Sequence, residues 1–167
     1  VQIGDARAAV PYFLTAWRSE QTMIEAPRNL AQVLILTGQT AKALEVLEKA
    51  LKSWPRDTDL QYLLAKAHHG MGRFDTAIIA ANEGLKSIPD SAALHTLRAL
   101  ALEQKGDSVT ARQDFQHAVR LAPQDPETRR AYAQFLAFHA QIEAAFAQVK
   151  AGLGAAPDHE GLLLQKA

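Results

Sequence analysis

Apolar and small residues recur along this chain at the spacing of a helix face, and the whole pattern repeats with a constant period. Residues 107–121 show one unit clearly, because apolar or small side chains stand at 111, 115, 118 and 119 while polar residues fill the opposite face. Asp107 or Ser108 is suited to cap the first turn, since the side-chain oxygen of either can accept a backbone hydrogen bond. The pattern predicts an amphipathic helix over these residues.

Prolines and glycines mark where each predicted helix ends. Four prolines are evenly spaced along the chain, at Pro55, Pro89, Pro123 and Pro157. A glycine or alanine stands half a period before each of them, at Gly38, Gly72, Gly106 and Ala140. Glycine suits the left-handed conformation that ends a helix, and proline stops a helix and starts a turn. Each unit is therefore predicted to be helix, turn, helix, turn. The units repeat every 34 residues, and a period of this length indicates a stacked repeat array.

The repeat frame divides the whole chain into one all-α array. Full copies are predicted at 24–57, 58–91, 92–125 and 126–159. Residues 1–23 fit the second helix of a partial repeat, and residues 160–167 fit the start of a further helix. Both ends of the array carry apolar side chains, and self-association through them is expected. These side chains are Phe13 and Trp17 at one end, and Leu162, Leu163 and Leu164 at the other.

Composition disfavours several classes of partner. The 18 basic and 18 acidic side chains cancel, so no broad positive field is expected to hold nucleic acid or an anionic membrane surface. The sequence has no run of about 18 apolar residues, so direct membrane insertion is not predicted. Cysteine is absent, which is compatible with a bacterial cytoplasm and with a periplasm alike. The compartment therefore stays open.

No sequence motif predicts catalysis or a cofactor. A metal cluster of His68, His69 and His95 is conceivable, but a structural role is favoured, with His68 as a half-buried ring whose tip meets water. Carboxylates cluster around the turns that follow the prolines, at Asp57, Asp59, Asp90, Asp125 and Glu127. Capping of helix amides is preferred for them over acid-base chemistry. The sequence therefore predicts a protein that is not an enzyme and binds no metal or cofactor.

Small residues at fixed repeat positions resemble the tetratricopeptide repeat. Each repeat is numbered from 1 to 34, with its proline at position 32. Alanine then stands at positions 8 and 20, glycine or alanine at position 15, and a small residue at position 27. The resemblance covers the entire chain and implies a right-handed superhelix of antiparallel helix pairs, whose first helices line a concave groove. Departures occur at Arg98, in place of a usual leucine at position 7, and at His68, in place of a tyrosine at position 11.

The resemblance also assigns a groove surface. In each first helix, positions 4, 7, 8 and 11 share one face, and positions 2, 5, 9 and 12 look outward. In the family the outward set lines the groove, with position 6 at its border. The predicted partner-binding residues are therefore Arg28, Gln32, Tyr62, Leu63, Lys66, His69, Thr96, Leu97, Leu100, Glu103, Arg130 and Gln134.

The groove residues do not fit the family's clamp for a C-terminal carboxylate. Arg28 and Gln32 match it in part, but Leu63 and Leu97 stand where the clamp needs polar or basic groups. The predicted function is a non-catalytic scaffold that binds a peptide or partner-protein segment with apolar anchors.

Two alternative functions remain open at this stage. The chain can be the recognition or oligomerisation arm of a larger enzyme, such as a glycosyltransferase. It can also belong to a bacterial envelope export or pilus assembly system, because its alanine-rich, lysine-poor second helices, such as residues 141–156, hint at a bacterial origin.

Overall fold

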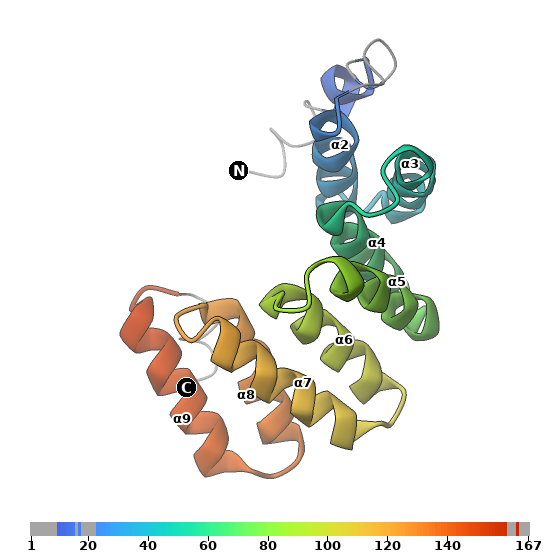
Figure 1. The fold of residues 1–167 in the computed structure, drawn as a ribbon. Coiled ribbons are helices and arrows are strands. Elements are labelled where there is room, and N and C mark those ends of the chain that lie inside the picture. The colour runs from blue at the N-terminus through green and yellow to red at the C-terminus, as the bar shows by residue number, and fades with distance from the viewer. Residues whose placement is uncertain (1–9, 16, 18–22, 160–162, 164–167) are drawn as a thin grey trace. The chain divides into compact units, whose positions relative to one another are not determined.

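The computed structural model describes residues 10–15, 17, 23–159 and 163, and all regular structure in this part of the chain is helical. A helical segment at residues 10–15 precedes the labelled helices (Figure 1). These are α2 (Glu25–Leu36), α3 (Thr40–Ser53), α4 (Thr58–Gly70), α5 (Phe74–Ser87), α6 (Ala92–Gln104), α7 (Ser108–Leu121), α8 (Pro126–Phe138) and α9 (Ile142–Ala155). The predicted all-α fold of paired helices is confirmed, with two helices in each repeat unit.

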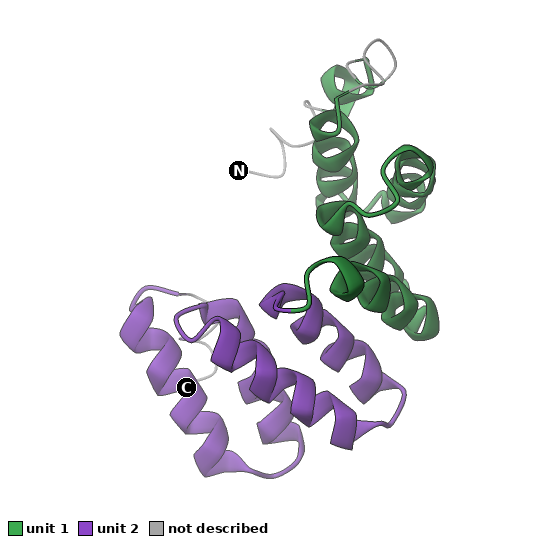
Figure 2. Ribbon diagram, viewed as in Figure 1, with its two compact units in different colours: residues 1–89 green, residues 90–167 purple. Residues whose placement is uncertain are grey.

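The helices group into two compact units, residues 1–89 and residues 90–167 (Figure 2). Unit 1 contains α2 to α5, and unit 2 contains α6 to α9. Within each unit the packing follows one rule: two consecutive helices form a pair, and the first helix of the next pair packs on both of them. Thus α4 contacts α2 and α3, and α8 contacts α6 and α7.

The turn between the two helices of each pair requires a left-handed residue. Gly38, Gly72 and Gly106 have φ angles of 75°, 70° and 84°, and Ala140 adopts the same conformation with φ 56°. A Cβ atom added to any of the three glycines would meet nothing within 4 Å, so the preference for glycine here comes from the backbone alone. The prediction for position 15 is confirmed.

Polar side chains cap the helices where the turn sequences predict. Backbone N–H groups donate to the side chains of Asp57, Ser91, Asp107 and Asp125. The donors lie one helical turn further on, at Leu60, Leu94, Thr110 and Thr128. The structural role predicted for Asp57 and Asp125 is therefore confirmed, because each satisfies an amide that the helix leaves unpaired.

Each unit has its own apolar core. In unit 1, Leu30, Leu47 and Leu60 are fully buried in one cluster. In unit 2 the cluster is aromatic: the ring centroid of Phe115 lies 5.6 Å from that of Tyr132 and 5.1 Å from that of Phe135. Both clusters join the second helix of one pair to the first helix of the next. Each cluster therefore continues from one repeat into the next.

A buried ion pair replaces apolar packing inside the third repeat. The carboxylate of Asp114 accepts from Nε and an NH2 group of Arg98, both at 2.7 Å, and lies 3.0 Å from Nδ1 of His95. In the first repeat the positions of Arg98 and Asp114 hold Leu30 and Val46, which are both buried. Arg98, which stands in place of the usual leucine, thus pairs with a residue on the second helix of its own pair. The sequence analysis did not predict this ion pair.

His68 corrects one sequence-based expectation. Its side chain is 9% exposed rather than half-buried, and its Nδ1 atom is buried without a hydrogen-bond partner. The side chain is therefore buried rather than half-buried, and whether its Nε2 meets water stays a prediction. Burial lowers the pKa of His68, and the charge of Arg73 lowers it further against the opposing effect of Glu48.

Substitution of Ala140 by glycine should stabilise the protein. An L-residue pays a steric penalty at positive φ, so Ala140→Gly is expected to raise the free energy of unfolding by up to about 1 kcal/mol. The matched control is Gly106→Ala, which introduces the same penalty and should lower the free energy of unfolding by a similar amount. Urea unfolding followed by circular dichroism measures both, and equal stability of Ala140→Gly and wild type would contradict the prediction.

Removal of the buried carboxylate should destabilise unit 2. Asp114→Ala removes the carboxylate that the half-buried guanidinium of Arg98 donates to, and a loss of about 2 kcal/mol is expected in urea unfolding. The double variant Arg98→Leu/Asp114→Val installs the pair found in the first repeat and should recover most of that loss. If the double variant is no more stable than Asp114→Ala, the ion pair is not the cause.

Candidate functional site

Arg28 lies on α2 among the predicted groove residues of unit 1, and its charge is already neutralised. Its Nε donates to Oδ1 of Asp57 at 3.1 Å, a second guanidinium nitrogen pairs with Oδ2 of Asp57, and its NH1 lies 3.1 Å from Asp59. The hydrogen bond with Asp57 raises the pKa of Arg28 despite partial burial. Gln32, one turn further along α2, is exposed.

The other groove residues of unit 1 form a stripe along α4. Tyr62 is half-buried against the core of unit 1, and Nζ of the exposed Lys66 lies 5.8 Å from the centroid of its ring. His69 is half-buried, and its ring meets that of Phe74 edge-on at 5.5 Å. Burial lowers the pKa of His69. The stripe therefore presents an aromatic ring, a cation and an imidazole at consecutive turns of one helix.

Two of the predicted groove residues of unit 2, Arg130 and Thr96, form hydrogen bonds with polar side chains of their own unit. Arg130 donates to Glu127 at 2.8 Å and to Gln134 at 3.2 Å. Thr96 donates to Thr128 at 3.4 Å. Polar contacts thus connect the groove face of unit 2 internally.

Glu103 and Leu100 complete the set of groove residues on α6. Oε1 of Glu103 lies 2.8 Å from Nε2 of His139, and its Oε2 is buried without a hydrogen-bond partner. Leu100 is half-buried against the core of unit 2. The surface that these two residues offer to a partner is therefore small.

Leu63 and Leu97, predicted to border the groove, are each only 7% exposed. Leu63 belongs to the core cluster of unit 1, and Leu97 is buried in α6. Both side chains therefore stabilise helix packing and have little area left for a partner. Their burial also separates this chain further from a carboxylate clamp, which would need polar groups at these positions.

Self-association is predicted through five apolar side chains at the ends of the array, and three of these lie among the described residues. Phe13 and Trp17 are half-buried against the core of unit 1, and Nζ of Lys49 lies 4.9 Å from the centroid of the Trp17 ring. Leu163 is 45% exposed, whereas Leu162 and Leu164 lie outside the described residues. Self-association through these ends stays a prediction.

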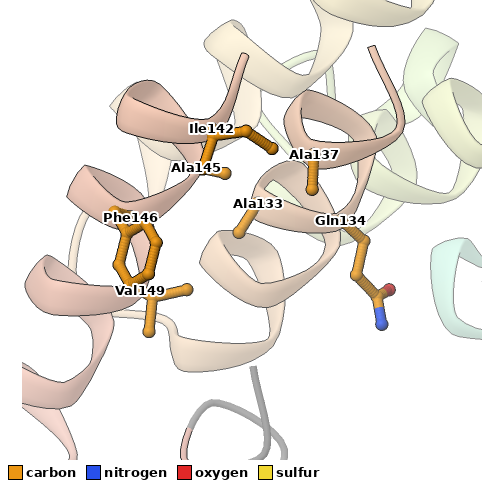
Figure 3. Close-up of a pocket in the computed structure, with 7 residues that line it drawn as sticks. All are labelled: Ala133, Gln134, Ala137, Ile142, Ala145, Phe146 and Val149. Carbon is orange, nitrogen blue, oxygen red and sulfur yellow. The ribbon is translucent and has the colours of Figure 1, made fainter. Parts of the chain in front are cut away.

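The sequence analysis missed an apolar cleft of about 400 Å³ between α8 and α9 (Figure 3). Its walls are Ala133, Gln134 and Ala137 from α8, and Ile142, Ala145, Phe146 and Val149 from α9. Ile142 is 52% exposed and Phe146 is 53% exposed, and together they form a contiguous apolar surface in the cleft. A signal existed in the sequence, because Phe146 holds position 21, where the first repeat has the buried Leu44.

The described residues contain no arrangement suited to metal binding. No group of three histidine, aspartate or glutamate side chains in this part of the chain is placed to hold a metal ion. The buried carboxylate of Asp114 is paired with Arg98. Among the same described residues, none of the helices is long and apolar enough to cross a membrane.

Helix pairs of fixed length, with a left-handed turn inside each pair and one helix of the next pair covering it, define a helical-repeat protein. Two tetratricopeptide repeat family models match the chain, one at residues 36–101 and the other at residues 92–125. The chain belongs to the tetratricopeptide repeat family. This family supports a protein-interaction scaffold, since its members bind protein or peptide partners and are typically non-catalytic. A search of curated proteins found no match.

Solved structures share this fold along most of their length. A thermophilic TPR protein of Thermus thermophilus, TTC0263, is 24% identical with a TM-score of 0.87, covering 97% of this chain and 89% of its own. MamA of Desulfovibrio magneticus RS-1 is 17% identical with a TM-score of 0.74, covering 94% and 89%. YrrB, described as a TPR protein with an unusual peptide-binding site, is 16% identical with a TM-score of 0.67, covering 98% and 84%. Because all three identities are below 25%, the similarity to these structures shows the fold alone.

The buried His68 and the half-buried His69 of α4 should make stability depend on pH. A histidine whose pKa is lowered by folding stays neutral in the folded protein, while the unfolded chain takes up a proton below about pH 6.5. The contribution of His68 and His69 is therefore fully present above that pH and is lost as pH falls. The variant His68→Leu/His69→Gln should lose less stability than wild type between about pH 7.5 and 5.5.

The control for this experiment is Gln61→Leu, which changes a buried polar side chain on the same helix without removing a titratable group. Its effect on the free energy of unfolding should be the same at both pH values. Urea unfolding at each pH measures the difference, and an unchanged pH dependence in the double variant would show that burial of these histidines is not responsible.

Proposed function

We propose that this chain is a non-catalytic scaffold that binds a peptide or a partner-protein segment on the groove faces of its first helices. The observation that carries the proposal is the stripe of Tyr62, Lys66 and His69 along α4, where aromatic and cationic groups are presented together. Tyrosine offers a large apolar area with a polar tip at little loss of side-chain entropy, which makes it an effective anchor for binding.

The charges of the groove favour a partner with apolar anchors over one that is held by its carboxylates. Arg28 and Arg130 already pair with carboxylates of their own units, so a new ion pair would require exchange of an existing one. Lys66 is exposed and lies beside an aromatic ring. An amphipathic segment that packs apolar side chains against Tyr62 and directs an acidic group to Lys66 meets both conditions.

The two alternative functions keep the same binding surface. As the recognition arm of a larger enzyme, the chain would deliver a substrate protein to a catalytic domain. As part of bacterial envelope export or pilus assembly, it would hold a component of the assembly. Similar solved structures come from bacteria, which supports a bacterial origin for this chain, and the description of YrrB as having a peptide-binding site supports peptide as the ligand class.

Selection from a phage-displayed random peptide library tests the proposal without a known partner. We expect enriched peptides to carry apolar anchors, and their affinity for the variant Tyr62→Ala/Lys66→Ala to fall at least about tenfold in fluorescence anisotropy. Lys52→Ala, on the exposed part of α3, is the control and should bind as wild type does. Circular dichroism establishes that both variants fold. Equal affinity of the double variant and wild type would refute the assignment of the groove.

A further inference from the structure

His69 differs from the other five histidines of the chain, all of which lie among the described residues. Three of the five have a ring nitrogen within 3.1 Å of a carboxylate oxygen: His95 beside Asp114, His139 beside Glu103, and His159 beside Glu127. Nδ1 of His117 lies 3.4 Å from NH2 of Arg120. Nδ1 of His68 is buried without a partner. Only the imidazole of His69 is left for a group from outside the chain.

The imidazole of His69 lies at the surface of α4 and makes no hydrogen bond with any part of the chain that the structure describes. Its side chain is half-buried, and its ring meets that of Phe74 edge-on at 5.5 Å. Neither of its nitrogens is fully buried, in contrast to Nδ1 of His68. A partner can therefore bind this imidazole without displacing an existing hydrogen bond.

Lys66 is the neighbour of His69 on the same face of α4. The two residues are three positions apart, which brings their side chains together on a helix. Lys66 is exposed, and its Nζ contacts the ring of Tyr62 without a carboxylate partner among the described residues. Arg28 and Arg130, the other cations of the predicted groove, are paired with carboxylates of their own units. The stripe on α4 therefore holds two groups, one turn apart, that can each donate to a new carboxylate.

The helices packed against α4 bring no carboxylate to His69. These helices are α2, α3 and α5. Glu48 of α3 and Arg73, at the start of α5, act on the pKa of His68, whereas burial alone lowers the pKa of His69. Asp75, in the first turn of α5, is exposed and has no effect on it. A carboxylate that favours the charged form of His69 therefore has to come from a partner.

Protonation makes His69 the second cation of the stripe. A histidine in an unfolded chain takes up its proton near about pH 6.5, and burial moves this uptake to lower pH for His69. A carboxylate bound beside the ring acts in the opposite direction and raises the pKa. Because proton uptake and binding are then linked, a partner that raises the pKa binds more tightly as pH falls.

We propose that His69 and Lys66 together bind an acidic side chain of the partner segment, and that His69 does so in its protonated form, so that acidification strengthens binding. This inference rests on the proposed groove function, because it assigns the partner's acidic group to these two residues. Tyr62, one turn before Lys66, offers the adjacent surface for an apolar anchor. The partner is thus a segment that carries an acidic residue next to an apolar one.

The pH dependence of peptide affinity tests the proposal. The probe is the fluorescein-labelled peptide that is most enriched in the phage selection on the full chain at about pH 7.5. Its affinity for wild type in fluorescence anisotropy should rise at least about threefold between about pH 7.5 and 5.5. The ratio of the two affinities should fall to about one for His69→Gln, and for the peptide whose acidic residue is replaced by its amide. An NMR titration of the His69 imidazole should show a higher pKa in the complex than in the free chain.

His117→Gln is the matched control for this experiment. It removes a half-buried histidine of α7 that is not a groove residue, so the ratio of its affinities should equal that of wild type. Circular dichroism at both pH values establishes that wild type and each variant are folded.

The failure of this proposal differs from a failure of the groove function. Peptide binding that Tyr62→Ala/Lys66→Ala weakens, but that does not change with pH, overturns the role of His69 and leaves the groove function in place. A pH dependence that persists in His69→Gln does the same, as do enriched peptides without an acidic residue. Peptide binding that Tyr62→Ala/Lys66→Ala leaves unchanged at both pH values overturns both proposals.

Discussion

Every helix pair in this chain has a face that only another helix can cover. Two short helices bury the residues between them, but the alanines and large apolar side chains on their far side stay open to water unless a third helix packs on both. In unit 1 this third helix is α4, and in unit 2 it is α8. The core clusters extend across these places, so burial between repeats adds to the apolar stabilisation that each pair has by itself.

The sequence was sufficient for the fold because the turn residues impose backbone geometry directly. A left-handed residue at Gly38, a proline at Pro55 and a capping carboxylate at Asp57 act locally, so their spacing determines helix boundaries without knowledge of the packing. His68 and Arg98 could not be placed in this way. Whether a polar side chain on a helix is buried, and what pairs with it, depends on the neighbouring helix, as the contact between Arg98 and Asp114 shows.

The candidate site was predictable only as a set of positions on the first helices. Helical geometry identified the outward residues, yet it could not show that Leu63 and Leu97 are almost fully buried or that Arg28 is neutralised by Asp57. The cleft was missed for a related reason. Position 21 is apolar in several repeats, and only the packing shows that Leu44 is covered while Phe146 is not. Whether an apolar side chain is covered depends on the helix that packs beside it, so the identity of a single residue does not reveal an uncovered surface.

The ion pair of the third repeat has a consequence for how the chain finds its native arrangement. Repeats with similar sequences can pair their helices wrongly during folding, since an apolar face accepts many partners. Arg98 is more selective, because its half-buried charge is stabilised by a carboxylate at the facing position. At that position the four repeats carry Val46, Ala80, Asp114 and Gln148. Of these four second helices, α7 alone supplies it. A pairing of α6 with the second helix of another repeat would lack this carboxylate, which disfavours that pairing.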